Sequence, residues 1–258
     1  MKNSHRIRVL SYNIHKGFSL GRKFILESLR ESIHKTGANL VFLQEVQGRH
    51  KKMTLDSSTQ AFSGQLEFLA DKMWPHYAYG RNAVYEDGDH GNGLMSEHPL
   101  VMVENIDISS NRFEKRGLLH AVMSFKEQTP VHLICVHLDL FESGRAQQIQ
   151  RIIQRLKTHV PDEAPLILAG DFNDWSEKAT ERIQSQLNLD EIFLVQEGRH
   201  AKSYPAAFPF LPLDRIYFRG LHPIKAQCLK GKPWSQLSDH NALYAEFDLI
   251  LTQPKVIS

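Results

Sequence analysis

Ionic and amide side chains follow an apolar run almost without transition in PLILAGDFNDW, residues 165 to 175. Asp171, Asn173 and Asp174 come directly after this run and Gly170. One interpretation is structural, since Gly, Asp and Asn form turns and Asp174 or Ser176 could cap a following helix. A second interpretation is chemical, because carboxylates bind divalent cations and accept protons during hydrolysis.

Two other strands carry polar groups in line with apolar side chains. The two-residue period of a strand places His137 with Val131, Leu133 and Cys135, and places Glu45 with Val41 and Leu43. An ionised carboxylate on an apolar face is costly unless it is paired, and a divalent cation is its strongest partner. Alternatively, Glu45 simply reaches solvent where its strand ends.

Asp214 poses the same problem in LDRIYFRG, where it alternates with Ile216 and Phe218. A buried carboxylate needs a hydrogen-bond partner. His240, in SDHNAL, is one candidate, and such a pair would fix the tautomer of the imidazole and raise its basicity. Arg215 and backbone amides are equally acceptable partners at this stage.

The elements that would position these groups follow a repeated order. Periodicity predicts a strand, a helix and a strand over 7–15, 23–37 and 39–46, and again over 131–140, 143–161 and 164–174. Such units pair their strands in parallel, and the carboxyl ends of parallel strands share one edge. That edge would collect Asn13, Glu45, His137, Asp171 and Asn173. A further helix is predicted over 59–73, and shorter strands over 117–125, 213–220 and 242–250.

Composition narrows the class of protein. No linker divides the 258 residues, so we predict a single domain over 1–258. A net charge of +2 does not indicate a dedicated polyanion binder, and two distant cysteines suggest neither a disulfide framework nor a zinc cluster. The N-terminal stretch becomes polar too early for a signal peptide, and no later run is long enough to span a membrane. We therefore expect a cytoplasmic protein without stable membrane insertion, and no obligate protein partner.

The chain resembles the endonuclease/exonuclease/phosphatase superfamily. The segments that carry this resemblance are, in order, LSYNIHKG, FLQEV, KRG, VHLD, AGDFND, LDRI and SDHNAL, and the resemblance covers residues 9 to 247. The resemblance implies an α/β fold, a four-layer α-β-β-α sandwich in which two mixed sheets pack face to face with helices outside. It also implies hydrolysis of phosphate esters with Mg²⁺ or Mn²⁺.

The resemblance further implies a role for each residue. Glu45 would be the principal metal ligand, helped by Asn13 and Asp239. Asp171 and Asn173 would hold the attacking water and the phosphoryl oxygens, His137 and His240 would contact the phosphate, and Asp214 would orient His240. Arg116 falls where relatives often carry a phosphate-contacting base, although it could be an exposed charge at a strand end. Asn92 matches a recurrent Gly-Asn that would contact phosphate, although it could be a plain turn residue. Asp171 and His240 are both plausible as the general base.

The substrate ester, whether small molecule, lipid or nucleic acid, depends on loops with weaker signals. RHKK, residues 49–52, could touch a nucleic-acid backbone but is more typical of a solvated loop. YEDGDHG places Glu86, Asp87 and Asp89 in a predicted loop that would repel DNA. YPAAFPFLPL, residues 204–213, could accept an apolar leaving group, although packing as core is the favoured interpretation. We therefore predict a phosphodiesterase or phosphatase, with a DNA or RNA nuclease as the alternative and a non-catalytic binding scaffold as the least favoured one.

Overall fold

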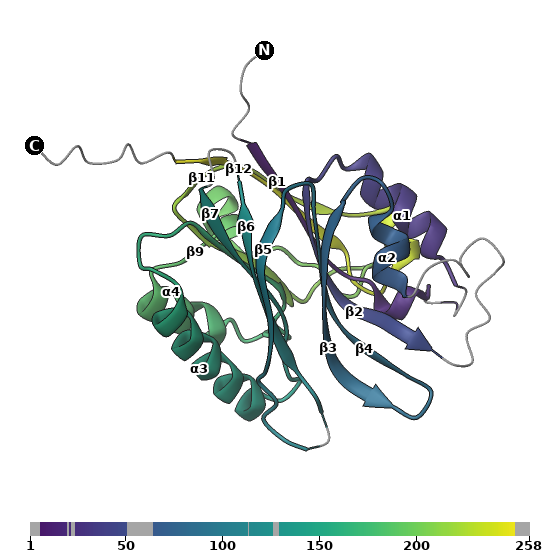
Figure 1. The fold of residues 1–258 in the computed structure, drawn as a ribbon, viewed down its shortest axis with the longest axis horizontal. Coiled ribbons are helices and arrows are strands. Elements are labelled where there is room, and N and C mark those ends of the chain that lie inside the picture. Colours follow the sequence, from purple (N-terminus) through teal and green to yellow (C-terminus); the bar gives the residue numbers. More distant parts are fainter. Residues whose placement is uncertain are drawn as a thin grey trace, which may run out of the picture.

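The computed structural model describes residues 6–19, 21, 24–50, 64–112, 114–125 and 129–250. Within these residues the chain forms two six-stranded sheets that lie face to face, with helices on their outer sides (Figure 1). The predicted four-layer α/β sandwich is therefore confirmed.

The first sheet has the order β11-β12-β1-β2-β4-β3. Its strands are β1 (Arg6–Asn13), β2 (Leu40–His50), β3 (His76–Tyr85), β4 (Gly88–Ser96), β11 (Leu221–Leu229) and β12 (Ala242–Leu249). β1 and β2 are parallel, as the first strand-helix-strand unit predicts, and the other pairs are antiparallel. The short helix η1 (His15–Gly17) follows β1, and the helices of this half are α1 (Leu26–Lys35), α2 (Gln65–Ala70) and α6 (Trp234–Leu237).

The second sheet has the order β5-β6-β7-β8-β10-β9. Its strands are β5 (Leu100–Asp107), β6 (Gly117–Ser124), β7 (Pro130–His137), β8 (Leu166–Asp171), β9 (Asp190–Glu191) and β10 (Asp214–Arg219). The second predicted unit is also confirmed, because β7 and β8 are parallel. The helices of this half are α3 (Glu142–His159), α4 (Lys178–Leu187) and α5 (Ile192–Glu197).

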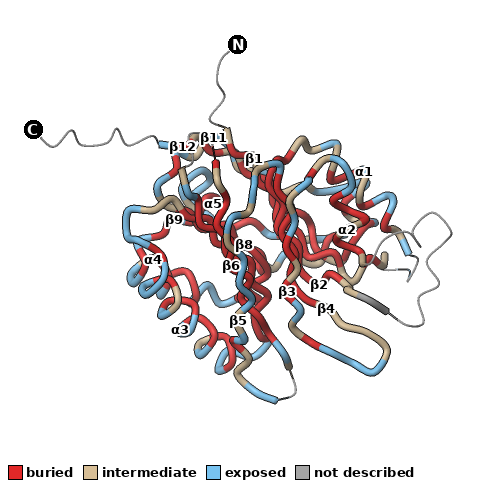
Figure 2. Tube along the Cα trace, viewed as in Figure 1, coloured by how far each residue is buried: buried red, intermediate tan, exposed pale blue. Residues whose placement is uncertain are grey.

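Three clusters of buried side chains hold the four layers together. Figure 2 shows that buried residues predominate along the central strands of both sheets. One lies between the two sheets and includes Phe42, Leu133 and Ile216. The second joins the first sheet to α1 and α2, and the third joins the second sheet to α3 and α4. The central strands therefore present one face to the inter-sheet core and the other face to the helices, as period two requires.

The predicted helices are present but shorter than their sequence patterns. α1 buries Leu29 and Ile33, and the chain leaves it through Gly37, which has a left-handed φ of 65°. α3 buries Ile149, Ile153 and Leu156. The predicted helix over 59–73 corresponds to α2, and its first residues, 59–63, lie outside the described part of the chain.

Several strands were not predicted, and one predicted loop is only partly correct. YEDGDHG forms the turn between β3 and β4 and the start of β4, so Asp89 lies in a strand. β4 contains glycines at 88, 91 and 93, which disfavour a strand prediction. Packing explains one of them, because a Cβ on Gly91 would lie 1.8 Å from the carbonyl oxygen of Gly80 on β3.

No helix in the described part of the chain is both long enough and apolar enough to cross a membrane.

Candidate active site

The ends of three neighbouring strands bring together three of the predicted site residues. β7 and β8 run parallel and pair His137 with Asp171, while β8 and β10 run antiparallel and pair Asp171 with Asp214. Partners in register stand side by side in a sheet. His137, Asp171 and Asp214 therefore meet at one edge of the second sheet, although they are far apart in the sequence.

A cleft of about 450 Å³ opens at this edge, a size suited to a small ligand or to part of a larger one. Seven predicted site residues line it: Glu45, Arg116, His137, Asp171, Asn173, Asp239 and His240. Asn13 and Asp214 lie directly behind these residues and bond to them. Nine of the ten predicted residues therefore gather at one place.

Asp171 lies at the centre of the hydrogen-bond network. Its Oδ2 accepts a hydrogen bond from Asn13 Nδ2 at 3.0 Å and lies 3.6 Å from Nε2 of both His137 and His240. Its Oδ1 accepts the backbone N–H of Asn173 at 2.9 Å. Burial raises the pKa of the Asp171 carboxyl group, and the charge of His240 opposes this shift only in part. Asp171 is therefore a stronger base than an exposed aspartate.

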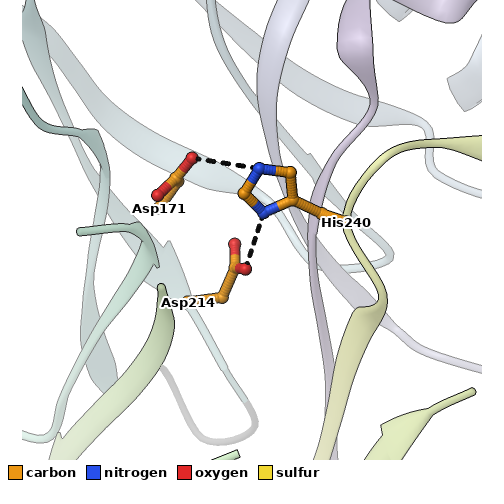
Figure 3. Close-up of side chains that lie close together, drawn as sticks. All are labelled: Asp171, Asp214 and His240. Atoms are coloured by element: carbon orange, nitrogen blue, oxygen red, sulfur yellow. Dashed lines mark hydrogen bonds and ion pairs between the residues drawn. The ribbon is translucent and has the colours of Figure 1, made fainter. Parts of the chain in front are cut away.

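His240 lies between two carboxylates (Figure 3). Its Nδ1 is 2.8 Å from Asp214 Oδ2, and its Nε2 faces Asp171. Burial alone would lower the pKa of His240, but the charges of Asp214 and Asp171 and the hydrogen bond to Asp214 raise it. The predicted Asp214–His240 pairing is confirmed, and the proposed alternative through Arg215 is wrong, because that guanidinium bonds to the backbone carbonyl of Asp214 and not to its carboxylate.

His137 has the opposite electrostatic environment. Burial, followed by the positive charges of Arg116 and His240, lowers its pKa well below the usual value. The cleft therefore holds one neutral and one cationic imidazole on either side of Asp171. Arg116 is itself nearly buried, and its Nη2 donates to Glu114 Oε1, so the interpretation as an exposed strand-end charge is wrong.

Glu45 reaches the cleft by a route that simple alternation does not predict. The register of β2 against β4 shifts by one residue between Leu43 and Val46, and Glu45 has a left-handed φ of 56°. Leu43 and Val46 both pack toward the helices, whereas Glu45 Oε1 accepts from Asn13 Nδ2 at 3.2 Å and lines the cleft. The prediction that Glu45 shares the face of Val41 and Leu43 is therefore wrong.

The donor set at the first sheet suits a hard divalent cation. Glu45, Asp239 and Asn13 offer only oxygen ligands, which Mg²⁺ prefers, and Asn13 links Glu45 to Asp171. A second arrangement exists among the described residues, because Asp171, Asp214 and His240 offer ligand atoms within 4.8 Å of one another. In that second set, His240 Nδ1 and Asp214 Oδ2 already form a hydrogen bond, which a metal would have to displace.

Asn173 and Asn92 differ in what they can offer a ligand. Asn173 has a left-handed φ of 49° and donates to the carbonyl oxygen of Leu138 at 2.9 Å, which leaves its side chain at the wall of the cleft. Asn92 lies in β4 and donates to the carbonyl oxygens of Gly117 and Cys135 on the opposite sheet. It is neither the turn residue nor the cleft residue that the sequence suggested, and we leave it out of the phosphate-binding set.

Asp174 has the structural role that its sequence context suggests. Its Oδ2 accepts the backbone N–H of Ala179 in the first turn of α4 at 2.7 Å, and its Oδ1 accepts the hydroxyl of Ser176. The structural interpretation of AGDFND is therefore confirmed for Asp174, and the chemical interpretation stays a prediction for Asp171 and Asn173.

Sequence reasoning missed Ser203, Lys16 and Glu114. Ser203 is fully buried and donates to Asp214 Oδ2 at 2.5 Å, the oxygen that also meets His240. Lys16 and Glu114 line the cleft. Lys16 sits in the quoted LSYNIHKG segment and could have been found there, whereas no pattern around Ser203 or Glu114 marks them.

The loops that bear on substrate choice are only partly described. Side chains of RHKK, residues 49–52, lie outside the described part of the chain. In YPAAFPFLPL, Ala206 and Leu213 are buried but Phe208 and Phe210 are exposed, so the favoured core interpretation is wrong for the two phenylalanines.

Comparisons with known proteins agree with this fold and identify the family. A sequence model described as "Endonuclease/Exonuclease/phosphatase family" matches residues 10–240. The "Uncharacterized protein YbhP" of Escherichia coli strain K12 is 42% identical over 244 residues, which cover 94% of this chain and 96% of that protein. The structure is similar to an endonuclease/exonuclease/phosphatase from Bacteroides vulgatus, with a TM-score of 0.75 and 18% identity over 95% of this chain and 99% of that one. It is also similar to the Bacteroides thetaiotaomicron mannosyl-6-phosphatase Bt3783, with a TM-score of 0.71 and 16% identity over 93% of this chain and 99% of that one. These two structural likenesses concern the fold alone.

Proposed function

The chain belongs to the endonuclease/exonuclease/phosphatase family, and from that premise we propose that it is a metal-dependent hydrolase of phosphate esters. The observation that carries this proposal is the environment of Asp171. Its nearly buried carboxylate lies 3.6 Å from two imidazoles and is linked through Asn13 to Glu45. A base, two hydrogen-bonding groups for phosphate and a carboxylate for a cation thus face one cleft.

Asp171 is the proposed general base. Its raised pKa supports proton acceptance from water, whereas His240 has a raised pKa and already carries a proton near neutral pH. In the reaction, a water oxygen bonds to phosphorus, its proton passes to Asp171, and the phosphorus–oxygen bond to the leaving group breaks. The leaving oxygen takes up a proton from solvent, and Asp171 returns its proton to solvent.

The remaining groups would stabilise the charge that develops on phosphate. His240 would act as a cation whose position is fixed by Asp214, and His137 would act as a neutral hydrogen-bond donor. Arg116 would add a second cation once its contact with Glu114 gives way to phosphate, and Asn173 would donate a hydrogen bond. These assignments follow from each group's charge state and from its place at the cleft.

Glu45 would hold Mg²⁺ or Mn²⁺ with the help of Asp239 and Asn13. A bound cation would supply charge neutralisation at the phosphoryl and leaving oxygens. Asn13 would keep Glu45 and Asp171 in fixed relation, because its Nδ2 donates to both carboxylates.

Among possible esters, we favour one that is not a long nucleic-acid duplex. Glu86 is exposed on the turn between β3 and β4, and Tyr85 beside it lines the cleft, so an acidic group stands at one entrance. Fixed negative charge there would repel a polyanion. A DNA or RNA nuclease is the second candidate, supported by the family itself.

The proposal is tested with a panel of substrates, each with and without Mg²⁺. The panel contains bis(p-nitrophenyl) phosphate, an aryl phosphomonoester, nicked and abasic DNA, single-stranded RNA, phospholipids and inositol phosphates. We expect turnover of at least one ester that disappears in Asp171→Asn. The control is Asp174→Asn, which alters a buried carboxylate that does not line the cleft. If no ester is hydrolysed, the proposal of an enzyme is refuted and a non-catalytic binding scaffold takes its place. If only nucleic acid is cleaved, the protein is a nuclease.

A further inference from the structure

Exposed aromatic side chains gather beside the cleft. The five most exposed aromatic residues in the described part of the chain, Tyr85 included, all lie on segments that line it. Four of them belong to the loops that adjoin β7, β8 and β10: Phe141 (72% exposed), Trp175 (49%), Phe208 (79%) and Phe210 (53%). Trp175 lines the cleft itself, Phe141 follows the lining residue Leu140, and the other two lie between the lining residues Tyr204 and Leu211. We name Leu140, Phe141, Trp175, Phe208 and Phe210 the apolar rim.

The topology explains why these side chains form one surface. β7, β8 and β10 are neighbours, and His137, Asp171 and Asp214 mark the ends of these strands at the cleft. The loop after His137 carries Leu140 and Phe141, the loop after Asp171 carries Trp175, and the loop before Asp214 carries Phe208 and Phe210. Three loops therefore leave adjacent strands at the same edge and place their apolar residues together.

The chemistry of the rim favours one occupant. Phenylalanine has no polar atom, and side chains that expose more than two thirds of their surface project outward and do not wall a pocket. Loose stacking of single-stranded nucleic acid combines aromatic residues with a basic groove. Two cations beside the rim are engaged, since Arg145 lies over the Trp175 ring at 4.6 Å and Lys178 pairs with Glu142 at 2.7 Å. A projecting, uncharged aromatic surface suits the interface of a bilayer with zwitterionic headgroups.

A second copy of the chain fits this surface less well. Leu140 and Trp175 belong both to the rim and to the wall of the cleft, so a protein seated on the rim would obstruct the entrance. A bilayer would instead present phosphate groups to that entrance. We propose that the apolar rim docks the protein on a phospholipid bilayer and that the cleft acts on a phosphate ester of a lipid in that bilayer. The second half of this statement rests on the proposed function, whereas the docking itself does not.

Docking can be followed with the intrinsic fluorescence of the chain. Trp74 and Trp234 are buried, and Trp175 is the exposed one of the three tryptophans. On addition of phosphatidylcholine vesicles to the full chain, we expect a blue shift of the emission and co-sedimentation with the vesicles. The double variant Phe141→Ser, Phe208→Ser should weaken partitioning by at least about tenfold, because two apolar rings no longer leave water.

A matched control removes exposed apolar side chains elsewhere. Val101→Ser with Val103→Ser changes the edge strand β5, and it should leave vesicle binding unchanged. Both double variants should hydrolyse bis(p-nitrophenyl) phosphate at the wild-type rate, which also verifies folding, while hydrolysis of vesicle phospholipid should fall only in the rim variant.

Each other outcome identifies a different error. Wild-type protein that does not bind vesicles, or a rim variant that binds as well as wild type, overturns the docking. Binding of single-stranded DNA that the rim variant loses would assign the rim to nucleic acid, and a dimer in light scattering that the rim variant dissociates would assign it to a second copy. Vesicle binding without hydrolysis of any ester of the substrate panel would leave the docking in place and refute the proposed function.

Discussion

Replacement of Asp214 by Asn tests how the charge of His240 is maintained. The variant keeps the shape of the side chain and an oxygen that can accept from His240 Nδ1 and from Ser203, both of which now meet Oδ2. It removes the negative charge next to a buried imidazole. The amide nitrogen would occupy the place of Oδ1, which is buried and has no hydrogen-bond partner among the described residues.

The expected magnitude follows from these contacts. A hydrogen bond to a charged group contributes roughly 1.5–3 kcal/mol and a neutral one roughly 0.5–1.5 kcal/mol. The reduction by about 1–1.5 kcal/mol should therefore lower kcat/KM by about 5- to 13-fold. The buried amide group adds a loss of about 1–3 kcal/mol in the free energy of unfolding. Both effects should appear with the overall fold retained, as judged by circular dichroism.

The pH dependence gives the sign of the effect. In the wild type, Asp214 raises the pKa of His240 against the effect of burial, so the imidazolium should persist into the alkaline range. In Asp214→Asn burial dominates, and the alkaline limb of kcat/KM should move toward neutral pH. The same linkage applies to stability. Protonated His240 stabilises the wild-type fold fully below the unfolded pKa of about 6.5, and this contribution is lost as pH rises through the raised folded value.

The assay is hydrolysis of a soluble phosphodiester from acid to alkaline pH. Asp174→Asn is the control, since it removes another buried carboxylate, one that bonds to Ser176 and Ala179 and not to His240. The control should lose stability without moving the alkaline limb. An Asp214→Asn enzyme that stays within about twofold of wild type and keeps the wild-type limb would refute the proposed role of His240 as a cation held by Asp214.

Three further predictions test other parts of the structure. EDTA should abolish hydrolysis and Mg²⁺ should restore it, and Glu45→Gln should raise the half-saturating Mg²⁺ concentration, by at least about tenfold if Glu45 is a direct ligand. Asn92→Ala removes two hydrogen bonds between the sheets and should cost about 2 kcal/mol in denaturant unfolding with an unchanged KM, whereas a raised KM would return Asn92 to the phosphate site. Burial lowers the pKa of His120 to about 3, so the wild type should lose stability as pH falls below about 6.5, by at most about 1.4 kcal/mol per pH unit from this group, and His120→Gln should flatten that slope in thermal melts.

The sequence predicts positions well where regular periodicity continues to the end of a strand. Val131, Leu133 and Cys135 lie in the inter-sheet cluster, and His137 continues their face into the cleft. Ile216 and Phe218 lie in the same cluster, which places Asp214 beside His240. In both strands a row of apolar residues identifies the buried face, and the polar residue at the end of the row lies on that same face.

The sequence predicts poorly where contacts from distant segments decide the outcome. Asn92 resembles a turn residue because glycines flank it, but its role is to bond to the carbonyl oxygens of two strands of the opposite sheet. The exposed phenylalanines at 208 and 210 resemble core residues because they are apolar and flanked by prolines. In both cases the environment of the side chain depends on segments that are distant in the sequence, and the neighbouring residues do not reveal it.

At Glu45 a single inserted residue, a β-bulge, interrupts the alternation of faces along β2. Leu43 faces Gly93 and Val46 faces Gly91, so two residues of β2, Gln44 and Glu45, lie opposite the single residue Asn92 of β4. The extra residue allows Val46 to return to the helix-facing core while Glu45 turns into the cleft. A left-handed backbone at a glutamate costs roughly 1–2 kcal/mol, and strain of this kind concentrates at functional sites. The strand thus keeps its core face intact on both sides of Glu45 and still delivers a carboxylate to the place where the proposed cation would bind.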